Sequence, residues 1–118
     1  MSTMRTPNDH TIPLRDYRFG RDQIDHPRWW VGGDPYATAF CNALSATFPL
    51  GERFFMDSVR AFRKEAKGPL CDQIAAFLYQ ESMHSREHVV FNAAATRAGY
   101  DMGPLEARTE RRLKFARS

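Results

Sequence analysis

The feature that most constrains the fold is a long segment with helical periodicity between Gly68-Pro69 and Gly99. Apolar residues recur in it every three or four positions, which places them on one face of an α-helix. Gly68-Pro69 marks its beginning, and Gly99 can adopt the left-handed conformation that commonly ends a helix. We therefore predict one helix from Leu70 to Gly99.

A second periodic segment precedes it and begins at Asp34-Pro35. An Asp side chain accepts from the free N–H groups of a first turn, and Pro at the first helical position loses no hydrogen bond. Pro49 and Gly51 interrupt the apolar pattern, because Pro lacks a backbone donor and Gly loosens the chain. We expect a kink or a short break at Phe48 to Gly51.

The remaining segments complete an all-α prediction. We expect a loop over Asp101 to Pro104 and a weakly amphipathic third helix over Leu105 to Arg117. No β-branched alternation indicates a strand. Residues 1–33 have no sustained period and predict an irregular N-terminal arm, anchored by Trp29-Trp30, before a helical domain over residues 34–118.

Composition excludes several classes of protein. With 42% hydrophobic and 26% charged residues the chain should fold as a globular domain, and no apolar run reaches the roughly 20 residues of a membrane helix. No apolar signal segment precedes Leu14, so we expect a cytoplasmic protein. The net charge of +3 comes largely from the basic end of the third helix, which does not predict nucleic-acid binding. Cys41 and Cys71 are expected to be reduced, buried thiols.

Ionisable residues lie within the apolar stripes of both long helices. The stripe of the second helix includes Glu81, His84 and His88, and that of the first includes Glu52. Burying such groups costs several kcal/mol unless each is paired or bound to metal. Antiparallel packing would bring Glu52 towards Glu81, and two carboxylates at close range repel each other unless a cation or proton lies between them.

Carboxylate and imidazole ligands suit iron, manganese or zinc. Glu81-x-x-His84 also has the spacing of the Glu-x-x-His element in ferritin-like di-iron and di-manganese bundles. The sequence therefore favours a divalent metal site, dinuclear in its complete form.

Other roles for these residues are open at this point. Glu52 can pair with Arg53 or Arg86, and His84 or His88 can be a core histidine that bonds to a backbone carbonyl or to Asn92. Taken alone, each of these residues is better explained by an ion pair or a hydrogen bond within the protein. Their position together on facing stripes favours a metal site. Glu65, Glu87, Glu106 and Glu110 lie off the stripe or on weak helices, and we expect them in solvent.

Three sequence blocks resemble a known family: WWVGGDPYATAFCNALSATFP (29–49), FPLGERFFMDSVR (48–60) and YQESMHSREHVVFN (79–92). They are similar to the bacterial proteins called predicted metal-dependent hydrolases, which have a ferritin-like helical bundle. The resemblance covers most of residues 28–99. It implies metal ligation by Glu52, Glu81 and His84, with His88 as a further ligand or as a residue that orients one.

Members of that family are typically about twice as long, with a second half similar to a repeat of the first. The chain therefore looks like an N-terminal half, a helical hairpin that is half of a four-helix bundle. We expect either a homodimer or a missing C-terminal half to complete it. In the dimer, the face formed by Phe55, Phe77, His84 and Phe91 would meet its own copy.

The function that the resemblance implies is a metal-dependent hydrolase of an unknown, small-molecule substrate, in a short form that can be inactive. One alternative is a di-iron oxidoreductase, and another is a non-catalytic metal-binding or storage protein. A third is a helical interaction module whose inward Glu and His pair with each other and bind no metal.

Overall fold

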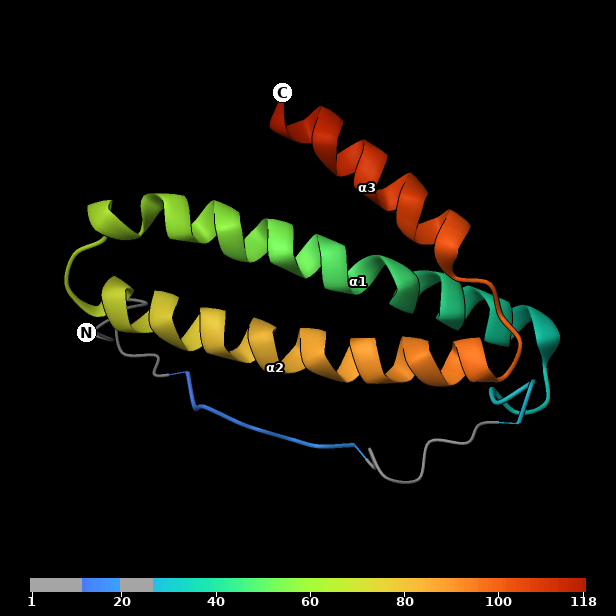
Figure 1. The fold of residues 1–118 in the computed structure, drawn as a ribbon. Helices are drawn as coiled ribbons and strands as arrows, with labels where there is room; N and C mark the ends of the chain where they lie inside the picture. The colour runs from blue at the N-terminus through green and yellow to red at the C-terminus, as the bar shows by residue number, and fades with distance from the viewer. Residues whose placement is uncertain (1–11, 20–26) are drawn as a thin grey trace, which may run out of the picture.

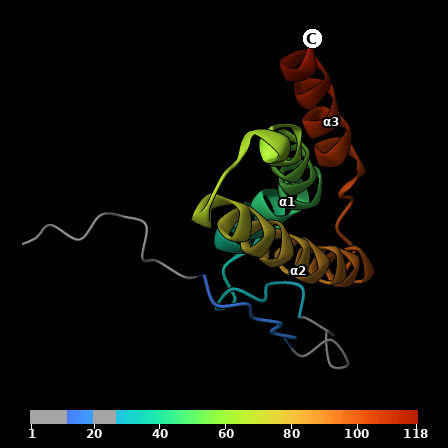
Figure 2. The same cartoon turned by 90° about the vertical axis from the view of Figure 1, so that its left-hand side faces the viewer.

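The computed structural model describes residues 12–19 and 27–118, and all regular structure in these ranges is helical. Its elements are α1 (Pro35–Phe62), a single 3-10 turn η3 (Arg63–Glu65), α2 (Pro69–Arg97) and α3 (Gly103–Arg117). The long helices α1 and α2 run antiparallel as a hairpin, and α3 packs against α1 (Figures 1 and 2). The all-α prediction is confirmed. In the described part of the chain, neither long helix is apolar enough to cross a membrane.

The predicted start of α1 and the predicted end of α2 are confirmed. The Asp34 carboxylate accepts from the backbone N–H groups of Tyr36 and Ala37, at 2.8 and 3.0 Å, so it caps α1. Gly99 has a φ of 97°, the left-handed conformation expected just after α2.

Two expected boundaries are wrong. Helix α1 continues through Pro49, so of the kink or short break expected at Phe48 to Gly51 the break does not form; Asn92 of α2 donates to the Ser45 carbonyl that Pro49 leaves without its helical partner. Helix α3 begins at Gly103 rather than Leu105, because the Asp101 side chain accepts from the Gly103 N–H at 3.0 Å and Pro fits the first turn that follows.

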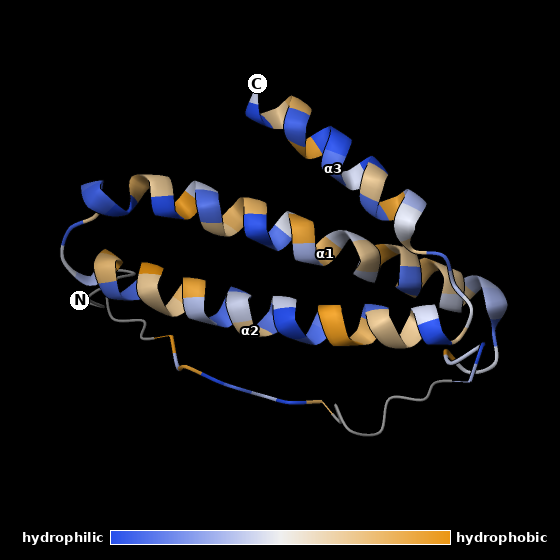
Figure 3. Ribbon diagram, viewed as in Figure 1, coloured by the Kyte–Doolittle hydropathy of each residue, from blue (hydrophilic) through white to orange (hydrophobic). Residues whose placement is uncertain are grey.

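The hairpin has a thin core of small side chains. The buried apolar residues are Ala46, Met56, Ala76, Ala94, Ala95 and Met102. Polar residues are buried nearly as often: Thr38, Asn42, Ser45, Glu52 and Asn92. Figure 3 shows apolar and polar residues interspersed along the visible sides of all three helices. Small residues allow α1 and α2 to approach closely, so polar groups on one helix reach those on the other.

The turn before α1 is held by Trp30, as the sequence predicts for the Trp pair. Its Nε1 donates to Asn42 Oδ1 at 3.0 Å, and its ring packs edge-on against Phe91 with 4.9 Å between centroids. We expected Phe91 on the face that meets a second copy of the chain. Trp30, just before α1, instead packs against Phe91. Phe55 of that face is 55% exposed.

Both cysteines are free, but the expectation that both are buried is wrong. Cys71 is exposed and Cys41 is partly exposed. Cys71 lies in the first turn of α2, where its thiol donates to the Ala66 carbonyl at 3.3 Å instead of entering the core.

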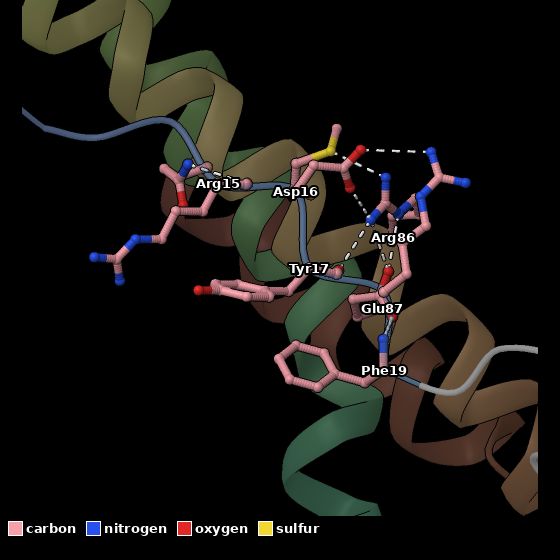
Figure 4. A network of polar contacts seen from close by, with 9 residues as sticks. Arg15, Asp16, Tyr17, Phe19, Arg86 and Glu87 are labelled. Carbon is pink, nitrogen blue, oxygen red and sulfur yellow. Dashed lines mark hydrogen bonds and ion pairs between the residues drawn. The ribbon is translucent and has the colours of Figure 1, made fainter.

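Of the expected arm over residues 1–33, the structure describes residues 12–19 and 27–33; residues 1–11 and 20–26 lie outside the described part. Residues 12–19, which we call the strap, run extended along α2 (Figures 1 and 4). Asp16 pairs with Arg86 at 2.6 Å, and the Phe19 N–H donates to Glu87 Oε2 at 3.2 Å. The strap is thus tied to one turn of α2 by charge and by backbone hydrogen bonds.

Glu87 is not solvated as expected. Its side chain is 14% exposed, because it accepts from Arg86 at 2.9 Å as well as from the strap. Arg86, through its hydrogen bond and positive charge, lowers the pKa of Asp16. The stabilisation by this pair is therefore present above the ordinary carboxyl pKa and is lost only as the pH falls through the lower folded-state value.

We predict that Arg86→Ala frees the strap without unfolding the hairpin. The variant removes the partner of Asp16 and the side chain that orients Glu87, so the Phe19 amide should exchange its hydrogen several-fold faster. Hydrogen exchange with mass spectrometry measures this. Arg60→Ala, which removes an exposed pair with Asp57 on α1, is the control; equal exchange in the two variants contradicts the prediction.

Candidate metal centre

Facing sides of α1 and α2 bring together a carboxylate and two imidazoles. Glu52, from the middle of α1, is only 2% exposed and faces α2. His84 Nδ1 lies 2.7 Å from Glu52 Oε1, and His84 Nε2 lies 2.9 Å from His88 Nε2. One ligand atom from each of the three residues lies within 4.8 Å of the others, so this group could hold a metal ion.

Glu81 lies at the edge of this group. Its Oε2 is 4.0 Å from His84 Nδ1, and its side chain is 23% exposed. The sequence predicted Glu52, Glu81 and His84 as ligands, with His88 close by. The structure groups Glu52, His84 and His88, whereas Glu81 lies beside this group.

The Glu52 carboxylate is in an unfavourable environment for a charge. Among the described residues, neither of its oxygens has a hydrogen bond of acceptable geometry, despite the close approach of His84. Burial raises the pKa of Glu52 above its ordinary value; the charge of His84 opposes this rise, that of Glu81 adds to it, and the nearby Ser85 side chain also lowers the pKa. A cation bound here would remove the penalty.

His88 has the opposite shift. Burial, followed by the charge of His84, lowers the pKa of His88 below its ordinary value. The ring is therefore neutral at neutral pH, which is the protonation state that a metal ligand requires.

Arg86 and Asn92 were alternative partners for Glu52 and the histidines. Arg86 makes its ion pairs with Asp16 and Glu87. His88 bonds to the Ser45 hydroxyl at 2.7 Å, which in turn bonds to the Asn92 amide oxygen at 2.6 Å. Asn92 therefore acts on His88 through Ser45.

Sequence reasoning did not assign a role at this site to Ser45 or Phe48. Ser45 lies on the same apolar stripe as Glu52, two turns earlier. This shared helix face is the sequence signal that could have identified Ser45 as part of the site. The Phe48 ring packs on His88 with centroids 4.4 Å apart and on His84 at 5.7 Å. It forms an apolar wall beside the two imidazoles.

His84 also borders a cleft on the other side of α2. The cleft has a volume of about 240 Å³ and lies between the strap and α2. Its walls are Arg15, Tyr17, Phe19, Gln80, Met83, His84 and Glu87. The His84 side chain is 53% exposed, so the metal group is reachable from outside through this residue.

We predict that Glu52→Gln stabilises the metal-free protein at neutral pH. The raised pKa of Glu52 contributes stability below the ordinary carboxyl pKa, and this is lost as the pH rises through the folded-state pKa. The variant should match the natural chain at about pH 4 and have a higher unfolding free energy at about pH 7. Urea unfolding at both pH values measures this, and a variant that is less stable at neutral pH contradicts it.

Comparisons with known proteins give one match. No curated protein and no solved structure matches the sequence significantly. A family model described as "Predicted metal-dependent hydrolase" matches residues 13–118, which include all three helices and the strap except for its first residue. The resemblance stated from the sequence blocks is confirmed, and the chain belongs to the family of predicted metal-dependent hydrolases.

Proposed function

We propose that the protein binds a divalent metal through Glu52, Glu81, His84 and His88 and hydrolyses a small-molecule substrate. The observation that carries the proposal is the buried Glu52 carboxylate, whose oxygens lack good hydrogen bonds and face two imidazoles. A folded protein retains such a costly group where it has a partner or a function.

The donor set supports iron, manganese or zinc. Carboxylate oxygen and imidazole nitrogen suit these metals, and both free thiols lie outside the group. A bound dication would supply an activated water at neutral pH. Glu81, at the partly exposed edge of the group, would serve as a further ligand or as a proton acceptor.

The cleft beside His84 is the proposed route for the substrate. Tyr17, Phe19 and Met83 give it apolar and aromatic walls. Such walls favour a small, largely apolar substrate, which would meet the metal group at the exposed edge of His84.

Oxygen chemistry at a di-iron site is the second candidate function. It is favoured by Glu81-x-x-His84 on one helix and Glu52 on the neighbouring helix, the arrangement that each half of a ferritin-like site contributes. Metal identity and turnover distinguish this function from hydrolysis and from simple metal storage.

We predict that protein purified without added metal contains iron, manganese or zinc, and that Glu52→Gln and His84→Ala reduce it to background. Each variant removes a ligand from the group, whereas Glu110→Gln, on the exposed side of α3, should retain full occupancy. Elemental analysis by mass spectrometry measures this. Equal metal in all three variants contradicts the site.

Turnover then distinguishes the classes of function. Hydrolysis of p-nitrophenyl acetate by the zinc or manganese form, lost in His84→Ala, supports the hydrolase. Oxygen consumption by the Fe(II) form supports the di-iron alternative. Metal binding with neither activity supports storage.

We further predict that a second copy completes the site by twofold association. A ferritin-like site takes Glu from two helices and Glu-x-x-His from two others, and this chain provides one of each. The exposed Phe55 and the half-exposed His84 are available for such an interface. Sedimentation with and without Fe(II) or Mn(II) should show a metal-strengthened dimer; a well-folded monomer whose mass ignores metal contradicts this.

A further inference from the structure

Pro49 leaves one carbonyl of α1 without its usual partner. In an α-helix the N–H of residue 49 would donate to the carbonyl of residue 45, but proline has no N–H. Asn92 on α2 provides the missing donor, since its Nδ2 lies 3.1 Å from the Ser45 carbonyl oxygen. The helix therefore continues through Pro49 at a point where it is bonded to its neighbour.

This bond fixes the orientation of the Asn92 amide. A carbonyl oxygen only accepts, so the NH₂ group of Asn92 must face it, and Oδ1 must face the Ser45 hydroxyl at 2.6 Å. The hydroxyl consequently donates its only hydrogen to Asn92.

The direction of the next hydrogen bond follows. Since the Ser45 hydrogen is already used, Ser45 Oγ must accept from His88 Nδ1, 2.7 Å away. Neutral His88 therefore carries its hydrogen on Nδ1. Its Nε2 then carries a lone pair, which in the metal-free protein accepts from His84 Nε2 at 2.9 Å, inside the metal group.

We propose that Pro49, Asn92 and Ser45 are positioning residues that hold His88 in the Nδ1–H tautomer, so that Nε2 is presented as a ligand. The use of Nε2 by a metal rests on the proposed function, whereas the tautomer is a property of the metal-free protein. We call this chain of hydrogen bonds the relay. It runs from the Ser45 carbonyl on α1 to Asn92 on α2, back to the Ser45 hydroxyl on α1, and from there to His88 on α2.

If these three positioning residues had only a structural role, they would hold α1 against α2 without determining the tautomer of His88. Pro49→Ala separates the two roles, because it restores a competing N–H for the Ser45 carbonyl and removes a helix-breaking residue. We expect it to raise thermal stability while weakening both the tautomer preference and metal binding. A structural tie alone would not change stability and metal binding in opposite directions.

The experiment is long-range ¹H–¹⁵N correlation of the histidine rings in metal-free protein at mildly alkaline pH, where imidazoles are neutral. The natural chain should show His88 with hydrogen on Nδ1. Ser45→Ala and Pro49→Ala should give a mixture of tautomers, and Ser45→Thr should restore the single form. Thr47→Ala is the matched control, since its hydroxyl donates to the Leu44 carbonyl of the same helix.

Metal titration with Zn(II) is the second readout, with affinity expected to fall about 10- to 100-fold in Ser45→Ala and to be restored in Ser45→Thr. Hydrogen on Nε2 of His88 in the natural chain, or a Ser45→Ala spectrum identical to it, overturns the relay. If the tautomer of His88 is unchanged in Pro49→Ala, Pro49 is not part of the relay. If Zn(II) fails to bind the natural chain while the tautomers behave as expected, the relay stands and the proposed function fails.

Discussion

The rest of the structure depends on a carboxylate buried between two helices. Glu52 is 2% exposed, and its Oε1 lies 2.7 Å from Nδ1 of His84. Removing a charged carboxylate from water costs far more than one ordinary contact returns, so burial raises the pKa of Glu52 and favours a nearby positive charge. The packing of α1 against α2 brings His84 and His88 within reach of this carboxylate.

This requirement explains the composition of the interface. Alanines such as Ala46, Ala94 and Ala95 occupy the most buried apolar positions, and they let the helices approach until side chains bond across the gap. Large aromatic side chains would give a more stable hairpin but would hold the helices apart. The outcome is a polar interface with a modest core, and apolar side chains such as Phe55 remain in solvent.

The sequence predicted the features that depend on local patterns. The cap at Asp34, the end at Gly99 and the grouping of Glu52 with His84 all follow from residue spacing along single helices. What could not be predicted depends on residues far apart in the chain. The continuity of α1 through Pro49 requires a donor from Asn92, 43 positions later, and no pattern within either helix reveals that pairing. The burial of Glu87 likewise depends on the strap.

His84 connects the interior of the hairpin with its surface. One edge of its ring meets Glu52 and His88 between the helices, while the same side chain borders the cleft beneath the strap. The strap is tied to α2 by Asp16 and Phe19, within one turn of this residue. Because the cleft wall is built by the strap, whatever loosens these contacts also changes access to His84. The strap and the group formed by Glu52, His84 and His88 therefore meet at His84, although they come from separate segments of the sequence.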